Sequence, residues 1–216
     1  MSTTESVHRC VSEERLRDDI TTNAEFGAIR TDEGHGRTVL TGTDANRRAR
    51  EYLVDRFEAA GLDVRVDAVG NITGRWVPDG ADPTARAVAC GSHLDSVPEG
   101  GIFDGVLGVY SGLEAVRALR AADADVDRPI EVVCFTEEEG GRFSNGVLGS
   151  SVASGKRSVE DALALEDDDG VTLDAALTDI GFRGTDRLDA SAWDSWLELH
   201  VEQGERLQDA GASVGI

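Results

Sequence analysis

The 216-residue sequence predicts an α/β fold, with a mixed, mostly parallel sheet flanked by helices. Short apolar runs typical of buried strands alternate with longer segments whose apolar residues recur at helical spacing. The sequence has no internal repeat, no low-complexity tract and no clear domain boundary. One α/β arrangement therefore accounts for the whole pattern.

Two helices are predicted in the first third of the chain. Residues 11–29 have helical apolar spacing, with one face formed by Ile20, Phe26 and Ile29. A Gly- and Thr-rich segment follows. Residues 43–62 then form a strongly amphipathic helix that begins near Asp44 and stops at Gly61, with an inward face of Leu53, Phe57 and Ala60.

The middle of the chain supplies most of the predicted sheet. Residues 63–77 alternate like two strands joined by a turn at Gly70-Asn71. Buried strands are predicted over 85–93 and 129–139, and a helix with a Leu, Val and Ala face over 108–122.

The last third is predicted to hold short elements. We predict short helices over residues 158–165 and 172–182. A strand is predicted over 195–203, and residues 204–211 follow it without an assigned element. The acidic stretch 165–174 is interpreted as a surface connection, because the spacing of an EF-hand calcium loop is absent.

The chain is strongly acidic. It has 42 Asp and Glu against 21 Lys and Arg, a net charge of −21, and Lys156 is its only lysine. Such a charge repels nucleic acid and anionic membranes, so neither is expected as a partner. The acids are spread along the chain, which favours a solvated acidic surface suited to a salty, halophilic cytoplasm.

Further features favour the cytoplasm. No apolar run approaches the length of a membrane span, and the N-terminal residues do not resemble a signal peptide. Cys10, Cys90 and Cys134 show no CxxC spacing and fit a reducing compartment. Cys90 and Cys134 fall in apolar runs, so we expect small buried side chains there.

Chemically active side chains gather where three predicted strands end. They are His93 and Asp95 after the first strand, Glu137, Glu138 and Glu139 after the second, and His200 and Glu202 in the third, with Asp104 in a Gly-rich turn after the first. In an open α/β sheet, ligands bind beyond the carboxyl ends of the strands. The three sets are therefore expected to face one site.

These residues predict a metal centre, although their spacing leaves a second interpretation open. Imidazoles and carboxylates that converge from different elements are suitable ligands for divalent metals. Adjacent Glu138 and Glu139 would allow one carboxylate to bind metal while the other acts as a general base. The alternative is that the Glu triplet is ordinary surface charge. His8 and His35 are expected to be structural or solvated.

Three motifs together are similar to a known family. They are "GSHLDSVPEGGIFDGVLGVYSGLEAVRAL", "FTEEEGGRF" with "LGS" shortly after, and "ELHVEQGERL"; "DAVGNITGRW" is a softer match. From about residue 20 onward, the chain resembles the amidase/hydantoinase/carbamoylase branch of the M20 metallopeptidase-like family. This branch contains N-carbamoyl-L-amino-acid hydrolases, β-ureidopropionases and allantoate amidohydrolases. The implied fold is a zinc-peptidase-like catalytic domain, incomplete at its C-terminus.

The resemblance implies a role for each matched residue. The implied metal ligands are His93 and His200 on one ion, Glu139 on a second ion, and Asp104 as the bridging carboxylate. The implied catalytic residues are the general base Glu138 and Asp95, whose carboxylate orients the His93 imidazole. Gln203 resembles a substrate-binding amide. Glu137 stands where the family usually has Asn or Asp.

The implied reaction is hydrolysis of a linear amide or ureido C–N bond by metal-activated water, with Glu138 as the base. The resemblance implies two divalent metal ions, zinc or manganese, with cobalt or nickel as further candidates. The implied partner is a small ureido or carbamoyl substrate of the N-carbamoyl-L-amino acid or allantoate type.

The resemblance also sets an expectation for domain organisation. Residues 1–216 correspond to the N-terminal portion of the metal-dependent catalytic domain, without the lid and dimerisation domain or the end of the catalytic domain. Family members are expected to be homodimers through that missing domain. No His follows His200, so the second metal lacks one partner. Two alternatives stay open: a truncated, inactive remnant or weak metal-binding module, and an M20 aminopeptidase acting on peptides.

Overall fold

A five-stranded mixed sheet forms the centre of the computed structural model, which describes residues 3–30, 32, 34–143 and 145–216. The strand order is β3-β4-β6-β5-β7. The strands are β3 (Asp63–Val66), β4 (Ile72–Trp76), β5 (Ala87–His93), β6 (Ile130–Phe135) and β7 (Trp193–Leu197). β5 is parallel to both of its neighbours, whereas β4 is antiparallel to β3 and β6. The predicted α/β class with a mixed sheet is confirmed.

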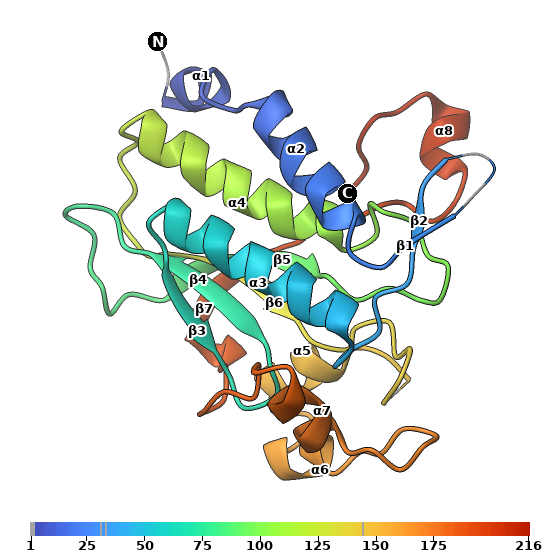
Figure 1. The fold of residues 1–216 in the computed structure, drawn as a ribbon. Coiled ribbons are helices and arrows are strands. Elements are labelled where there is room, and N and C mark those ends of the chain that lie inside the picture. The colour runs from blue at the N-terminus through green and yellow to red at the C-terminus, as the bar shows by residue number, and fades with distance from the viewer. Residues whose placement is uncertain (1–2, 31, 33, 144) are drawn as a thin grey trace.

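Helices flank this sheet (Figure 1). One face is covered by α2 (Glu13–Ala24), α3 (Asp44–Ala59) and α4 (Val106–Ala121). Four short helices complete the set: α5 (Leu148–Ala153), α6 (Val159–Leu163), α7 (Leu173–Asp179) and α8 (Arg206–Ala210). Outside these layers lie α1 (Thr3–His8), a two-stranded ribbon of β1 (Ala28–Ile29) and β2 (Gly36–Arg37), and a 3₁₀ turn over Ala190–Ala192.

Two apolar clusters hold the layers together. The larger one joins the three long helices to the sheet and includes Leu53, Phe57, Val109 and Leu113, each 0% exposed. The smaller one packs on β5, β6 and β7 through Ala89, Val133, Phe135 and Trp193. Cys134 is buried and Cys90 is half-buried, and all three cysteines are free thiols.

The predicted helix over 11–29 is correct at its start and too long at its end. Ser12 caps α2 by accepting a hydrogen bond from the Arg15 N–H at 3.2 Å. The helix stops at Ala24, and Gly27 follows in a left-handed conformation with φ of 72°. Phe26 therefore lies in a turn and Ile29 in β1, so only Ile20 of the predicted face is buried in the helix.

The other boundary differences are smaller. Thr43, rather than Asp44, caps α3. Helix α5 was not predicted, because its six residues are too few to show a period. The strand predicted over 195–203 ends at Leu197, so His200 lies in the loop after β7.

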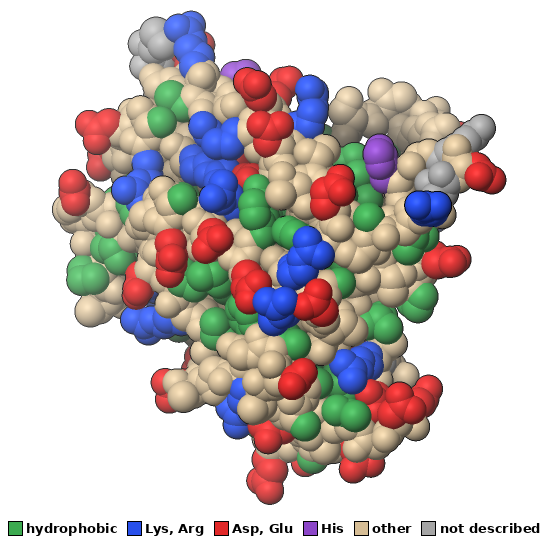
Figure 2. Space-filling model, in the orientation of Figure 1, with side chains coloured by type: hydrophobic (Ala, Val, Ile, Leu, Met, Phe, Trp, Pro, Cys, Tyr) green, Lys and Arg blue, Asp and Glu red, His purple; other side chains and the backbone are tan. Residues whose placement is uncertain are grey.

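Charged side chains are spread over the surface as the sequence predicted. Figure 2 shows acidic and arginine side chains interspersed on the face formed by α2, α3 and α4. His8 and His35 are exposed, which agrees with a solvated role. Within the described residues, no helix has both the length and the apolar character needed to cross a membrane.

Substituting Gly91 should destabilise the centre of the sheet. Gly91 has a φ of 148°, and an added Cβ would lie 1.9 Å from the Val133 carbonyl oxygen on β6. Gly91→Ala is expected to lower the free energy of unfolding by about 3 kcal/mol or more, since both the backbone and β6 must move. Urea unfolding followed by circular dichroism measures this change.

Gly80→Ala is the matched control for that experiment. Gly80 also has a positive φ, 85°, but nothing lies within 4 Å of its added Cβ. It should cost about 1 kcal/mol, which is the strain of the left-handed backbone alone. Equal losses for the two variants would contradict the steric argument at Gly91.

Candidate metal centre

The three strand ends predicted from the sequence meet at one edge of the sheet. β5 lies between β6 and β7 and runs parallel to both, so their carboxyl ends coincide. His93 is the last residue of β5, while Glu138 and Glu139 follow β6 and His200 follows β7. Asp104 lies two residues before α4, which returns from the same edge.

The side chains converge closely. The Asp104 Oδ1 atom lies 3.1 Å from His200 Nε2 and 3.8 Å from His93 Nε2. Glu138 Oε2 lies 3.4 Å from His93 Nε2 on the other side. Two groups offer ligand atoms within 4.8 Å of one another: His93, Asp104 and His200, and His93, Glu138 and Glu139. The predicted metal ligands are therefore brought together.

Two polar atoms at the centre of this cluster lack the hydrogen bonds that buried polar atoms normally make. His93 Nε2 and Asp104 Oδ1 are buried, and neither forms a hydrogen bond of acceptable geometry among the described residues, although Asp104 Oδ1 lies 3.1 Å from His200 Nε2. Buried polar atoms in proteins are nearly always hydrogen-bonded or bound to an ion. Imidazole nitrogen and carboxylate oxygen together suit zinc, manganese and related divalent ions. The residues present therefore fit a divalent metal.

The His93 ring is oriented by a backbone group. Its Nδ1 lies 3.0 Å from the main-chain oxygen of Asp95, and 3.6 Å from the Asp95 carboxylate. This differs from the orientation by the carboxylate that the family resemblance implies. The Asp95 carboxylate instead accepts a hydrogen bond from the Glu139 N–H at 3.0 Å. Asp95 therefore connects the end of β5 to the end of β6, and its carbonyl directs His93 Nε2 into the site.

Glu137 shapes the turn that carries the other two glutamates. It is 1% exposed and has a left-handed φ of 53°. Its Oε1 accepts hydrogen bonds from the N–H groups of Arg142 at 2.8 Å and Phe143 at 2.6 Å. The sequence pattern predicted that Glu137 would face the site with its two neighbours, whereas the structure directs its Oε1 to backbone N–H groups of its own turn. Its one signal was a triplet of acids directly after a buried strand.

The environment of the two following carboxylates changes their acidity. Burial raises the pKa of Glu138, while the neighbouring His93 acts in the opposite direction. Burial also raises the pKa of Glu139, and the nearby Asp104 carboxylate adds to that rise. A carboxylate with a raised pKa is a better proton acceptor, which is the property that a general base needs.

The segment after β7 contributes contacts that the sequence did not predict. The Gln203 amide donates a hydrogen bond to Asp104 Oδ2, so in this structure it contacts a predicted ligand. Its substrate-binding role stays a prediction. Glu202 accepts a hydrogen bond from the Leu207 N–H at 2.9 Å, at the start of α8. Glu198 accepts one from the buried Ser92 hydroxyl at 2.5 Å.

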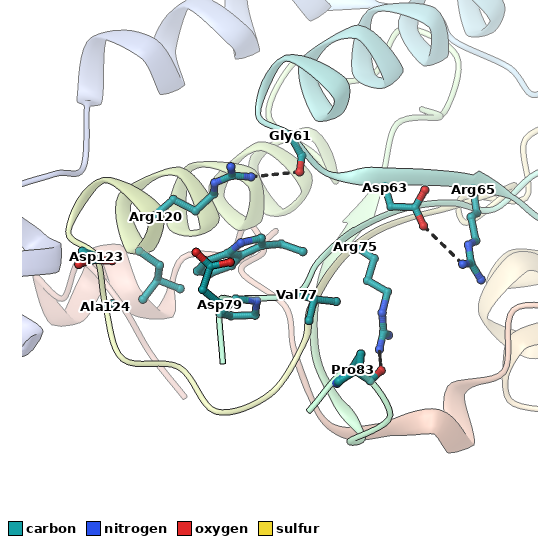
Figure 3. Close-up of a pocket in the computed structure, with 13 residues that line it drawn as sticks. Gly61, Asp63, Arg65, Arg75, Val77, Asp79, Pro83, Arg120, Asp123 and Ala124 are labelled. Carbon is teal, nitrogen blue, oxygen red and sulfur yellow. Dashed lines mark hydrogen bonds and ion pairs between the residues drawn. The ribbon is translucent and has the colours of Figure 1, made fainter. Parts of the chain in front are cut away.

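A second concave region lies far from this centre (Figure 3). It is a groove of about 740 Å³ at the C-terminal end of α4, lined partly by Arg65, Arg75 and Arg120. The candidate metal centre lies at the opposite end of that helix, whose 16 residues span roughly 24 Å at 1.5 Å per residue. Arg75 donates to the Pro83 carbonyl and Arg120 to the Gly61 carbonyl. The guanidinium groups of Arg75 and Arg120 therefore bind backbone carbonyls of neighbouring loops.

Comparison with known proteins identifies the family. The model of peptidase family M28 matches residues 71–193, which is more than half of the chain. The chain belongs to that family. The matched region contains His93, Asp95, Asp104, Glu138 and Glu139 and ends before His200.

Two relatives show which members of the family this chain is similar to in sequence. It is 41% identical over 197 residues to an N-carbamoyl-L-amino acid amidohydrolase of Geobacillus stearothermophilus, covering 89% of this chain and 47% of that protein. It is 38% identical over 183 residues to a ureidoglycolate hydrolase of Arabidopsis thaliana, covering 81% and 38%. The chain therefore spans half or less of the length of these relatives.

The fold has close counterparts among solved structures. A hydantoinase/carbamoylase family amidase from Burkholderia ambifaria matches 93% of the M28 chain and 48% of its own, with a TM-score of 0.86 and 45% identity. The arrangement of the sheet and helices is thus that of a hydantoinase/carbamoylase amidase over nearly all of this chain.

Gly105 should be essential to the geometry of the candidate metal centre. An added Cβ at this position would lie 2.5 Å from three atoms of the His93 ring, Nε2 included. Gly105→Ala is expected to displace the ring and to weaken divalent-metal affinity about tenfold or more, the range seen when a ligand loses its orientation. Isothermal titration calorimetry with Mn²⁺ measures the affinity.

Gly181→Ala serves as the control, because Gly181 has a similar φ of 76° with nothing within 4 Å of its added Cβ. It should bind Mn²⁺ with unchanged affinity. A Gly105→Ala protein that binds Mn²⁺ as tightly as this control would show that His93 is not a ligand.

Proposed function

We propose that this chain carries the metal-binding half of a hydrolase that cleaves linear amide or ureido C–N bonds. The observation that carries the proposal is the convergence of His93, Asp104 and His200 with Glu138 and Glu139. At the centre of this group, two buried ligand-type atoms form no hydrogen bond with any part of the chain that the structure describes.

Each side chain has a proposed task in that reaction. His93 and His200 would hold one divalent ion and Glu139 a second, with Asp104 between them. Zinc or manganese are the proposed ions, with cobalt and nickel as chemical alternatives. When bound, such ions supply Lewis acidity toward the carbonyl oxygen and lower the pKa of water.

Glu138 is the proposed general base. It lies beside His93 at 3.4 Å and offers a carboxylate whose pKa is raised by burial. In the proposed reaction it removes a proton from the attacking water and then delivers that proton to the leaving nitrogen. Asp95 keeps His93 Nε2 directed into the site through its carbonyl oxygen. Gln203 is proposed to contact the substrate after leaving Asp104.

The names of the relatives support the substrate class. The relatives are named as amidohydrolases of N-carbamoyl-L-amino acids and as a hydrolase of ureidoglycolate, and both kinds of substrate contain a ureido group. We therefore propose a small ureido or carbamoyl substrate, and a place in the carbamoylase branch that the sequence motifs resemble. We further propose that residues 1–216 are the N-terminal portion of the catalytic domain, that homodimers form through a domain outside them, and that the protein works in the cytoplasm.

A peptide substrate is the second candidate. The family model that matches residues 71–193 is that of a peptidase family. A two-metal centre with a glutamate base can hydrolyse a peptide bond by the same steps. The two candidates differ only in the group next to the carbonyl carbon, so a direct comparison of substrates decides between them.

Substituting Glu138 tests the proposed mechanism. Purified chain is supplied with Mn²⁺ or Zn²⁺ in high salt and assayed on N-carbamoyl amino acids, allantoate, ureidoglycolate and dipeptides. Glu138→Gln should lower kcat about 10²- to 10⁴-fold, the usual contribution of a general base, while Mn²⁺ still binds. Glu160→Gln, an exposed glutamate on α6, is the control and should leave kcat unchanged.

Three results would contradict parts of this proposal. Full turnover by Glu138→Gln would exclude it as the base. Faster turnover of dipeptides than of ureido substrates would favour the peptidase alternative. Metal binding without turnover of any substrate would indicate a metal-binding module that is inactive as an isolated chain.

A further inference from the structure

Arg37 is a buried cation directly behind the metal centre. Its side chain belongs to β2 and is among the largest fully buried side chains, at 0% exposed. Its guanidinium donates from Nη1 to the Asn23 side-chain oxygen at 2.8 Å, and from Nη2 to the Leu94 carbonyl at 3.0 Å. Both acceptors are neutral. Burying a charge on neutral partners is unfavourable, so a role beyond simple packing is worth testing.

The Leu94 carbonyl links Arg37 to the candidate metal centre. Leu94 lies between His93, a proposed ligand, and Asp95, whose carbonyl faces His93 Nδ1. A hydrogen bond to the Leu94 carbonyl therefore fixes the peptide unit between Leu94 and Asp95. The rotation of this short turn determines where His93 Nε2 points.

The backbone around Arg37 fastens the same loop at further points. The Arg37 N–H donates to the Gly100 carbonyl at 3.0 Å. Two residues later, the Val39 N–H donates to the Ser96 hydroxyl and the Ser96 N–H to the Val39 carbonyl, both at 3.0 Å. Residues 37–39 thus hold the loop that runs from His93 toward Asp104.

The guanidinium itself is held by the helical layer. Asn23, on α2, is 0% exposed, and its amide nitrogen donates to the Tyr110 hydroxyl on α4 at 3.2 Å. That contact leaves the Asn23 oxygen facing Arg37. A planar guanidinium donates in fixed directions from separate nitrogen atoms, whereas the three N–H donors of a lysine ammonium all radiate from one nitrogen.

We propose that Arg37 is a positioning residue for the metal centre: by holding the Leu94 carbonyl against Asn23, it fixes the His93–Asp95 turn so that His93 Nε2 faces Asp104. This inference rests on the proposed function. Arg37 touches neither substrate nor metal in it. Burial lowers the pKa of Arg37, and Asp95 is the first of several groups, Tyr110 and Asp104 among them, that oppose this lowering.

Cobalt binding to the full 216-residue chain tests the proposal. Co²⁺ affinity is measured by titration calorimetry, and the visible absorption spectrum of the bound Co²⁺ reports the geometry of its ligands. The variants are Arg37→Met, Arg37→Lys and, as a control, Arg117→Met. Arg117 is also a largely buried arginine, but it pairs with Asp19 and Glu114 between α2 and α4, away from the loop.

Arg37→Met is expected to weaken Co²⁺ binding about 10- to 100-fold, the usual effect of losing a partner behind a ligand, and to change the visible spectrum. Arg37→Lys should recover part of the affinity, because it keeps the charge and a donor but lacks the two separate nitrogens with which Arg37 reaches Asn23 and Leu94. Arg117→Met should keep the affinity and spectrum of the original chain even where it lowers thermal stability.

The outcomes separate the two proposals. No Co²⁺ binding by the original chain would overturn the metal-dependent function and this inference with it. Binding by the original chain and equally by folded Arg37→Met, with the same spectrum, would overturn the role of Arg37 alone. If Arg37→Met does not fold, Asn23→Ala replaces it, since it removes one of the two acceptors; unchanged affinity and spectrum there would equally overturn the inference.

Discussion

The parallel pairing of β5 with β6 on one side and β7 on the other is the constraint on which the site depends. Six residue pairs align β5 with β6, from Val88 opposite Ile130 to His93 opposite Phe135. A shift of one residue would turn every side chain of β5 to the opposite face. The register keeps His93 beside the turn that begins after Phe135. Gly91 is needed within it because β6 passes too close for a Cβ.

Buried polar groups around the centre extend this constraint from the sheet to the loops. Asp95 joins the ends of β5 and β6, Glu137 closes the turn after β6, and Arg37 fastens the loop after β5. Each makes hydrogen bonds mainly to backbone groups. Such bonds fix loop conformation more than they add net stability, since a buried charge loses most of its hydration. The centre is therefore rigid at the expense of stability.

The sequence predicted the strands and long helices well, because each of these segments is long enough to show the spacing of apolar residues that is typical of its structure. It could not predict that α2 ends at Ala24, since Gly27 stops it through a local conformation rather than a change of period. The ligand-type residues were identifiable because they lie at or shortly after the ends of predicted strands. The roles of Glu137 and Arg37 were not predictable, because a buried charge leaves no periodic signal. Glu137 bonds to backbone N–H groups of its own turn, and Arg37 bonds to the Asn23 side chain and to the Leu94 carbonyl, which is distant in sequence.

The unsatisfied atoms of the structure link folding to metal binding. Eight buried side-chain atoms lack a hydrogen-bond partner among the described residues, and four of them, His93 Nε2, Asp95 Oδ1, Asp104 Oδ1 and Glu137 Oε2, belong to the end of β5 or to the loops that follow β5 and β6. Three of them are carboxylate oxygens, whose charges repel one another in a low dielectric. A divalent cation between these loops would replace that repulsion by attraction. Any ion that binds only the folded chain raises its stability by mass action, so the same residues that weaken the metal-free fold would make it depend on the metal.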